Sequence, residues 1–161
     1  MKLKACHSHL NGLEWIKIKK PNIWQEINDV IDSVDATKFK TKIGREKGNK
    51  GKKLYSPEKL NKEFDRKFSG LGWNEQGRKY FYCQSDPEIN KKLLEMTFEE
   101  QKQYNLEHPE LELIKSYNSS DFDKERVAIE VQFGKYSFVQ FDIFIKHASD
   151  YMNDHIDVGI E

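Results

Sequence analysis

Apolar residues recur at helical spacing in three segments of the first half of the chain. A loose pattern covers residues 10–18, and a stronger one begins at Pro21, where a proline fits the first helical turn. Its apolar positions lie three or four residues apart: Ile23, Ile27, Val30, Ile31 and Val34. A third pattern follows Ser56 and Pro57, a helix-capping serine and a first-turn proline, and ends near residue 70 at two glycines. We expect three helices in this half.

The following segments mix strand and helix patterns. Residues 78–83 are short and rich in aromatic side chains, as is typical of a strand. Residues 86–96 predict a short helix that begins at Pro87. The segment 97–112 contains five glutamates and Pro109, and it fits an exposed acidic helix or a loop.

Strict alternation of apolar and other residues marks the segment 126–133. One side would carry Val127, Ile129, Val131 and Phe133, and the other Ala128, Glu130 and Gln132. This pattern predicts a half-buried strand. A charged turn at 123–125 separates it from the stretch around Asp121, so the two stretches are expected to pair as a hairpin. A helix over 138–152 and a strand over 154–161 follow, which makes the chain an α/β protein.

Length and composition describe one globular domain over residues 1–161. The chain is 37% hydrophobic and 12% aromatic, which is too apolar for a disordered chain. Basic and acidic residues number 27 each, but residues 1–83 carry a net charge of +9 and residues 84–161 a net charge of −9. The neutral total therefore hides a basic half and an acidic half.

The basic charge is densest between Lys38 and Lys53. Eight lysines and arginines occur there with three glycines and a single acid, Glu46. A mobile loop of this kind is a candidate for neutralising nucleic-acid phosphates, with Lys50, Lys52 and Lys53 at its end. A solvated connection without a ligand explains the same composition.

Cysteine content and apolar runs bear on the location of the protein. Cys6 and Cys83 are the only cysteines in the sequence, so no disulfide framework is expected. The N-terminus has no secretion-signal core, and no run of about 18 apolar residues could span a bilayer. We expect a cytoplasmic protein without a membrane partner.

Two acidic residues stand where the predicted hairpin brings its strands together. An antiparallel turn places residues near 121 and 130 at one end of the sheet, so the carboxylates of Asp121 and Glu130 can converge. With a main-chain carbonyl such as that of Val131, they offer the hard oxygen ligands that Mg²⁺ prefers. The alternative is that Glu130 and Gln132 lie on the solvent face of a strand and Asp121 in a turn.

The residues 116–136, SYNSSDFDKERVAIEVQFGKY, resemble the catalytic segment of the BglII/BstYI group of type II restriction endonucleases. Other similar segments are SHLNGLEW (8–15), PNIWQEI (21–27), KGKKLYSP (50–57) and IDVGIE (156–161), and they are closest to the BstYI branch. The resemblance spans nearly the full chain. It implies a restriction-endonuclease-like core with a central mixed β-sheet flanked by helices.

This group carries a variant of the PD-(D/E)XK core, and the sequence shares its two departures from the superfamily pattern. Ser120 replaces a proline, and Gln132 replaces a lysine. The resemblance implies that Asp121, Glu130 and the Val131 carbonyl hold Mg²⁺ while Gln132 orients the attacking water. Because an amide cannot act as a base near neutral pH, proton removal would fall to metal-activated water or to the substrate phosphate.

The resemblance also implies a substrate and an assembly. The substrate would be double-stranded DNA with a GATC-centred palindrome, most simply purine-GATC-pyrimidine, and a homodimer would present one site to each strand. Lys135 is similar to the position from which this group reaches into the major groove, where a lysine can donate to guanine. An exposed lysine at a strand-to-helix junction is the alternative.

Members of this group continue beyond the last predicted strand, so the chain is expected to lack C-terminal elements of the core. Two other classes of function stay open: a non-cleaving DNA-binding remnant, and a protein-interaction module that uses the segregated charge. Glu14 is a weaker candidate for assisting the metal site, and His147 is expected to be a packed or polar-face residue rather than a base.

Overall fold

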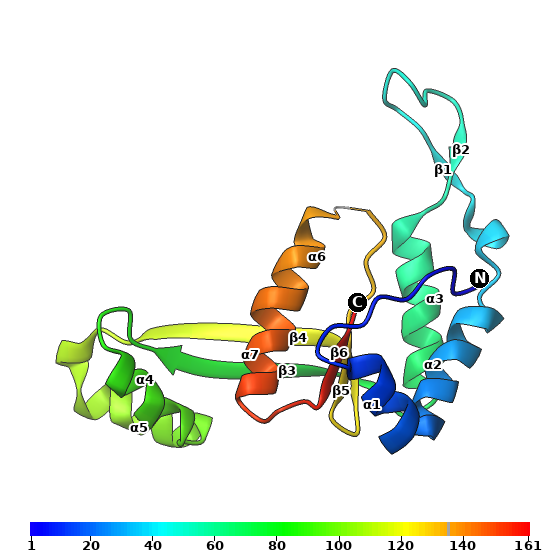
Figure 1. The fold of residues 1–161 in the computed structure, drawn as a ribbon. Coiled ribbons are helices and arrows are strands. Elements are labelled where there is room, and N and C mark those ends of the chain that lie inside the picture. Colours follow the sequence, from blue (N-terminus) through cyan, green and yellow to red (C-terminus); the bar gives the residue numbers. More distant parts are fainter. Residues whose placement is uncertain (135) are drawn as a thin grey trace.

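The computed structural model describes residues 1–134 and 136–161, and its centre is a four-stranded mixed sheet (Figure 1). The strand order is β3 (Asn74–Tyr82), β4 (Ile114–Lys124), β5 (Val127–Ile129) and β6 (Val158–Ile160). β4 pairs antiparallel with β3 and β5, whereas β5 and β6 are parallel. The predicted α/β class, with a mixed sheet flanked by helices, is confirmed.

The three predicted N-terminal helices are present as α1 (Gly12–Lys19), α2 (Pro21–Ser33) and α3 (Pro57–Ser69). Both α2 and α3 begin with a proline, which needs no hydrogen-bond donor in the first turn. Ser56 caps α3, because its side chain accepts a hydrogen bond from the Lys59 N–H.

The basic segment between α2 and α3 contains the expected loop, which a pair of two-residue strands closes at its base. A 3₁₀ turn over Ala36–Phe39 leads into β1 (Lys42–Ile43), which pairs antiparallel with β2 (Lys53–Leu54). Figure 1 shows this hairpin projecting away from the helices and the sheet.

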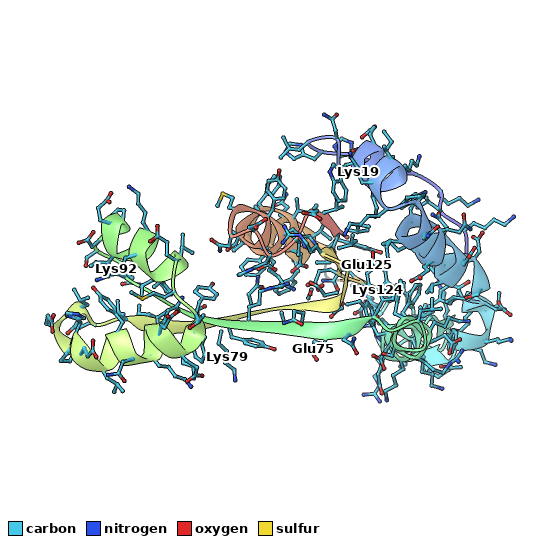
Figure 2. All side chains as sticks on the ribbon, turned by 90° about the horizontal axis from the view of Figure 1, so that it is seen from below. Lys19, Glu75, Lys79, Lys92, Lys124 and Glu125 are labelled. Atoms are coloured by element: carbon cyan, nitrogen blue, oxygen red, sulfur yellow. The ribbon has the colours of Figure 1, made fainter. Side chains whose placement is uncertain are left out.

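β3 and β4 form a long ribbon that carries a helical tip at its far end (Figure 1). The tip consists of α4 (Pro87–Leu94), α5 (Phe98–Glu107) and a 3₁₀ turn over Pro109–Leu111. The ambiguous acidic segment is thus mostly helix, and Thr97 and Glu100 cap α5 reciprocally. Figure 2 shows Lys79 on the side of this ribbon that faces away from the helices after β5.

The turn between β4 and β5 is a two-residue hairpin loop. Lys124 pairs with Val127, and the intervening Glu125 and Arg126 have φ angles of 50° and 64°, as a type I′ turn requires. Neither is a glycine or an asparagine, so tertiary contacts must support the left-handed backbone. Arg126 provides one, because its Nε donates to the Asp157 carboxylate at 3.0 Å.

The main hydrophobic core lies between α1–α3 and one face of the sheet. Its buried members are Ile16, Ile23, Ile27, Val30, Val34, Leu60, Phe64, Phe68, Trp73, Phe122, Val127, Ile129 and Val158. Trp73 is fully buried and meets Phe68 edge-on, with ring centroids 5.3 Å apart. The Trp73 Nε1 donates to the Glu26 carboxylate at 3.0 Å, and Lys124 pairs with the same carboxylate.

β5 is buried on both faces, which corrects the expectation of a half-buried strand. Every residue from Val127 to Glu130 is buried, because β5 lies between two strands and helices cover both sheet faces. The strand also ends at Ile129 rather than at Phe133. Val131 and Phe133 nevertheless pack against the same core as Val127 and Ile129, as the alternation predicts.

The second face of the sheet is covered by one continuous helical segment. It comprises α6 (Ser137–Phe141), the π-helical stretch η3 (Asp142–His147) and α7 (Ala148–Met152). Its large apolar side chains are mostly exposed, including Phe141, Phe144, Ile145, Tyr151 and Met152, whereas Asp142, His147 and Asp150 are buried. This segment therefore turns polar side chains toward the sheet.

Ion pairs fasten α7 to the ribbon. The Arg78 guanidinium on β3 contacts the carboxylates of Asp123 on β4 at 2.8 Å and Asp150 on α7 at 3.0 Å. All three side chains are largely buried.

None of the helices among the described residues is long and apolar enough to cross a bilayer.

Candidate active site

Asp121 and Glu130 face each other across the β4–β5 pair. Phe122 pairs with Ile129 and Asp123 with Ala128, and the same register places Asp121 opposite Glu130, one residue past the end of β5. Because side chains alternate along a strand, both carboxylates project away from the main core and toward the helical segment 137–152. The structure thus brings together the two acids that the sequence singled out.

The Asp121 carboxylate is fastened to the main chain of the neighbouring segment. Its Oδ2 accepts a hydrogen bond from the Val131 N–H at an N–O distance of 2.9 Å. The Glu130 N–H donates in turn to the Ile160 carbonyl at 2.8 Å. These two bonds tie β4, the end of β5 and β6 together at the point where the acids meet. Ser120, which stands where the superfamily pattern has a proline, is buried.

Glu130 is buried in a strongly charged setting. Burial, which disfavours the charged carboxylate, raises the pKa of Glu130 to about 7. The negative charges of Asp121 and Asp142 raise this pKa further, and the hydrogen bond and charge of Lys146 oppose the rise. Glu130 therefore interacts electrostatically with the acids on β4 and on the helical segment as well as with Lys146.

Two residues that sequence reasoning missed complete this charged cluster. Lys146 on η3 donates a hydrogen bond to Glu130 Oε1 and lies 3.4 Å from Asp142 Oδ1. Asp142 and Lys146 are four residues apart on one helical segment, so they share its sheet-facing side. The signal in the sequence was two charged residues at helical spacing within an apolar stretch.

Glu161 is a further acid near the pair. The residue is exposed, but its carboxyl group is partly desolvated and interacts with the charges of Asp121 and Asp142. Desolvation is the main cause that raises the pKa of Glu161 to about 7, and the charge of Asp142 adds to it. The negative potential therefore extends from the β4–β5 pair to the end of β6.

The other predicted residues lie at varied distances from this cluster. Gln132 is half-buried two residues after Glu130, beyond the end of β5. Lys50, Lys52 and Lys53 belong to the projecting hairpin, far from β5 in Figure 1. Lys135 lies outside the described residues. Glu14 is exposed on α1 and accepts a hydrogen bond from Ser8, and His147 is buried, as expected of a packed residue.

The cluster fits a hard divalent cation that keeps much of its water. Within residues 1–134 and 136–161, no three His, Cys, Asp or Glu side chains are arranged to hold a metal ion. Magnesium needs fewer, since it is usually bound through one or two carboxylates together with water and phosphate oxygens. The mutual repulsion of Asp121 and Glu130 is the structural feature that a cation between them would relieve.

Comparison with known families places these acids in a wider context. The sequence matches the family model for restriction endonuclease BglII/BglIII over residues 4–161. A search of curated proteins finds no match. The family match covers nearly the whole chain and includes every residue of the cluster.

Proposed function

The chain belongs to the BglII/BglIII family of type II restriction endonucleases, which hydrolyse DNA, and on this premise we propose Mg²⁺-dependent cleavage at a GATC-centred palindrome. Purine-GATC-pyrimidine is the proposed site, because several segments of the sequence resemble the BstYI branch. The observation that carries the proposal is the convergence of Asp121 and Glu130 on one face of the sheet, with interacting charges.

The proposed cation ligands are the carboxylates of Asp121 and Glu130 and the main-chain carbonyl of Val131. When bound, Mg²⁺ would supply a Lewis acid for the phosphate and acidify the attacking water. Asp121 is preorganised for this task by its bond from the Val131 N–H. Gln132 would orient the water without taking its proton, because its amide is not basic.

The proposed DNA contacts come from two places. The hairpin lysines Lys50, Lys52 and Lys53 would neutralise phosphates, and the projection of this hairpin from the body would let it follow a DNA backbone (Figure 1). Lys135 would reach a guanine in the major groove. A homodimer would place one site on each strand of the palindrome.

The test is to map the ends of fragments after incubation with unmethylated DNA of known sequence and Mg²⁺, with an EDTA sample as the control. The expected result is a single set of ends at purine-GATC-pyrimidine sites in the Mg²⁺ sample alone. Salt-sensitive DNA binding without cutting would instead identify a non-cleaving remnant, and the absence of DNA binding at low salt would favour a protein-interaction module.

A further inference from the structure

Lys146 is the one ammonium group, among the described side chains, that is hydrogen-bonded to either acid of the pair. Its Nζ donates to Glu130 Oε1 and also lies 3.4 Å from Asp142 Oδ1. The acids of this cluster, Asp121, Glu130, Asp142 and Glu161, outnumber it four to one. Gln132, the polar residue nearest to Glu130 in the chain, carries no charge.

The Lys146 ammonium group is held in place by the packing of its helical segment against the sheet. The Lys146 side chain is 17% exposed, so it does not move freely in water. Its partner Asp142 lies one helical turn earlier on the same segment, and the Asp142 side chain is 10% exposed. The segment is anchored to the sheet by the Arg78–Asp150 ion pair and by the contact of His147 with the Gly159 backbone.

This arrangement differs from that of an ordinary structural ion pair on the same molecule. Lys124 pairs with Glu26 at 2.7 Å and is 21% exposed, but its partner also accepts from the indole of Trp73 beside the main core. Lys146 instead contacts an acid that faces a second acid across a strand pair. The two lysine side chains are similarly buried, but the partner of Lys124 lies beside the main core, whereas the partner of Lys146 faces Asp121.

We propose that Lys146 is a positioning residue for DNA cleavage: it holds the Glu130 carboxylate toward Asp121 and keeps a fixed positive charge beside the acid pair. This inference rests on the proposed function of Asp121 and Glu130. Lys146 acts through Glu130, and it balances the repulsion among the carboxylates when no cation is bound.

Two consequences follow from this role. A lysine that attracts Glu130 competes with a divalent cation for the same carboxylate, so its removal should tighten cation binding by about tenfold. The released Glu130 carboxylate would also lose its fixed orientation, and changes of this kind in a supporting residue typically lower turnover by about 10- to 100-fold. Tighter cation binding with slower cleavage is the combined signature.

The experiment compares four full-length proteins: wild type, Lys146→Met, Lys146→Arg and the matched control Lys124→Met. Cation binding is read from the thermal unfolding midpoint of the DNA-free protein over a MgCl₂ titration. Cleavage is read as separate kcat and KM values on a purine-GATC-pyrimidine duplex.

We expect Lys146→Met to reach half of its Mg²⁺-induced stabilisation at about one tenth of the wild-type concentration. Its kcat should fall about 10- to 100-fold while KM stays within about threefold. Lys146→Arg should recover part of the kcat, because it keeps the charge. Lys124→Met should lower the unfolding midpoint but leave kcat and the Mg²⁺ midpoint at wild-type values.

Several results would overturn the inference. One is a wild-type kcat in Lys146→Met, and another is a loss of kcat in Lys124→Met equal to that in Lys146→Met, which would indicate a general loss of stability. If Lys146→Met does not fold, Lys146→Gln keeps a hydrogen-bond donor without the charge, and a wild-type kcat in that variant overturns the inference as well.

The failure of this inference is distinguishable from the failure of the proposed function. If wild type cleaves and Asp121→Asn does not, the acid pair is catalytic whatever Lys146 does. If wild type does not cleave and Mg²⁺ does not stabilise it, the proposed function fails first.

Discussion

The main-chain N–H of Val131 donates to the carboxylate of Asp121 at 2.9 Å, so the first acid of the candidate site is tied to the residue that follows the second. This bond ties the segment that follows β5 to β4. It also uses only one of the two Asp121 oxygens, which leaves the other available to a ligand.

Asp121→Asn should abolish Mg²⁺-dependent cleavage and leave DNA binding intact. The amide oxygen of asparagine can still accept the Val131 N–H, so the local backbone should not change, but the charge that would hold the cation is lost. We expect kcat to fall about 1,000-fold or more. Cleavage assays with fluorescence anisotropy for DNA binding check this, and a variant that cuts at the wild-type rate refutes the assignment of Asp121.

Replacing Lys50, Lys52 and Lys53 together with alanine should weaken DNA binding in a salt-dependent manner. If all three contact phosphates, the slope of log K against log salt should become shallower by about 2 to 3, because each contact releases roughly one counterion. Anisotropy titrations at several salt concentrations measure this slope. The control is the triple alanine variant of Lys91, Lys92 and Lys102 on α4 and α5, and an equal change in both variants would show that the hairpin is not a specific contact.

Arg78→Met should destabilise the fold strongly. The change leaves Asp123 and Asp150 without the cation that each contacts, and removing one partner of a buried ion pair typically costs about 3–5 kcal/mol. Denaturant unfolding measures the loss. Arg66→Met is the matched control, because Arg66 pairs with Glu63 on the surface and is 66% exposed against 15% for Arg78. The control should change the unfolding free energy far less, because solvent screens an exposed pair, and similar losses in both variants would contradict the role given to Arg78.

His147 should make the protein less stable in mild acid. Burial, aided by the charge of Lys146, lowers the pKa of His147 to about 4 from an ordinary value near 6.5, and a hydrogen bond with the Ile160 main chain and the charge of Asp142 oppose this shift. Between these values the unfolded chain binds a proton that the folded chain does not. The stability that His147 contributes is therefore complete above pH 6.5 and is lost as the pH falls toward 4, by about 3 kcal/mol in total.

Comparison of wild type with His147→Gln isolates this effect. The raised pKa of Glu130 titrates in an overlapping range with the opposite sign, since the folded state then binds the extra proton. The diagnostic quantity is thus the difference in unfolding free energy between the two proteins, measured by denaturant at pH 7.5, 6, 5 and 4.5. A difference that does not change with pH would refute the burial of a neutral imidazole.

Gly159→Ala should destabilise the protein because the imidazole of His147 lies against the Gly159 backbone. A Cβ at position 159 would come within 2.3 Å of the His147 Cγ, and overpacking of this kind costs about 1–3 kcal/mol. Gly12→Ala is the control on α1, where the added methyl would meet Val158 at an ordinary 3.8 Å. Thermal unfolding should show a lower midpoint for Gly159→Ala only, and tolerance of both changes would show that His147 can move away.

Local patterns determined most of the elements. Helices α2 and α3 were predicted with their starts because proline and a capping serine act within one turn of the chain, and apolar spacing reports the buried face directly. The opposition of Asp121 and Glu130 was also predictable, because alternation along two adjacent strands decides which side chains share a face.

Contacts between elements distant in the sequence determined the turn between β4 and β5, the burial of β5 and the charges around the acid pair. The type I′ turn at Glu125 and Arg126 lacks the usual glycine or asparagine and relies on Asp157, 31 residues further along the chain. β5 is buried on both faces because a helical segment with buried acids covers it, and that same segment delivers Asp142 and Lys146 to the acid pair. The periodicity of apolar residues shows which face of a single helix or strand is buried. Which distant charge meets which acid depends on how the elements pack.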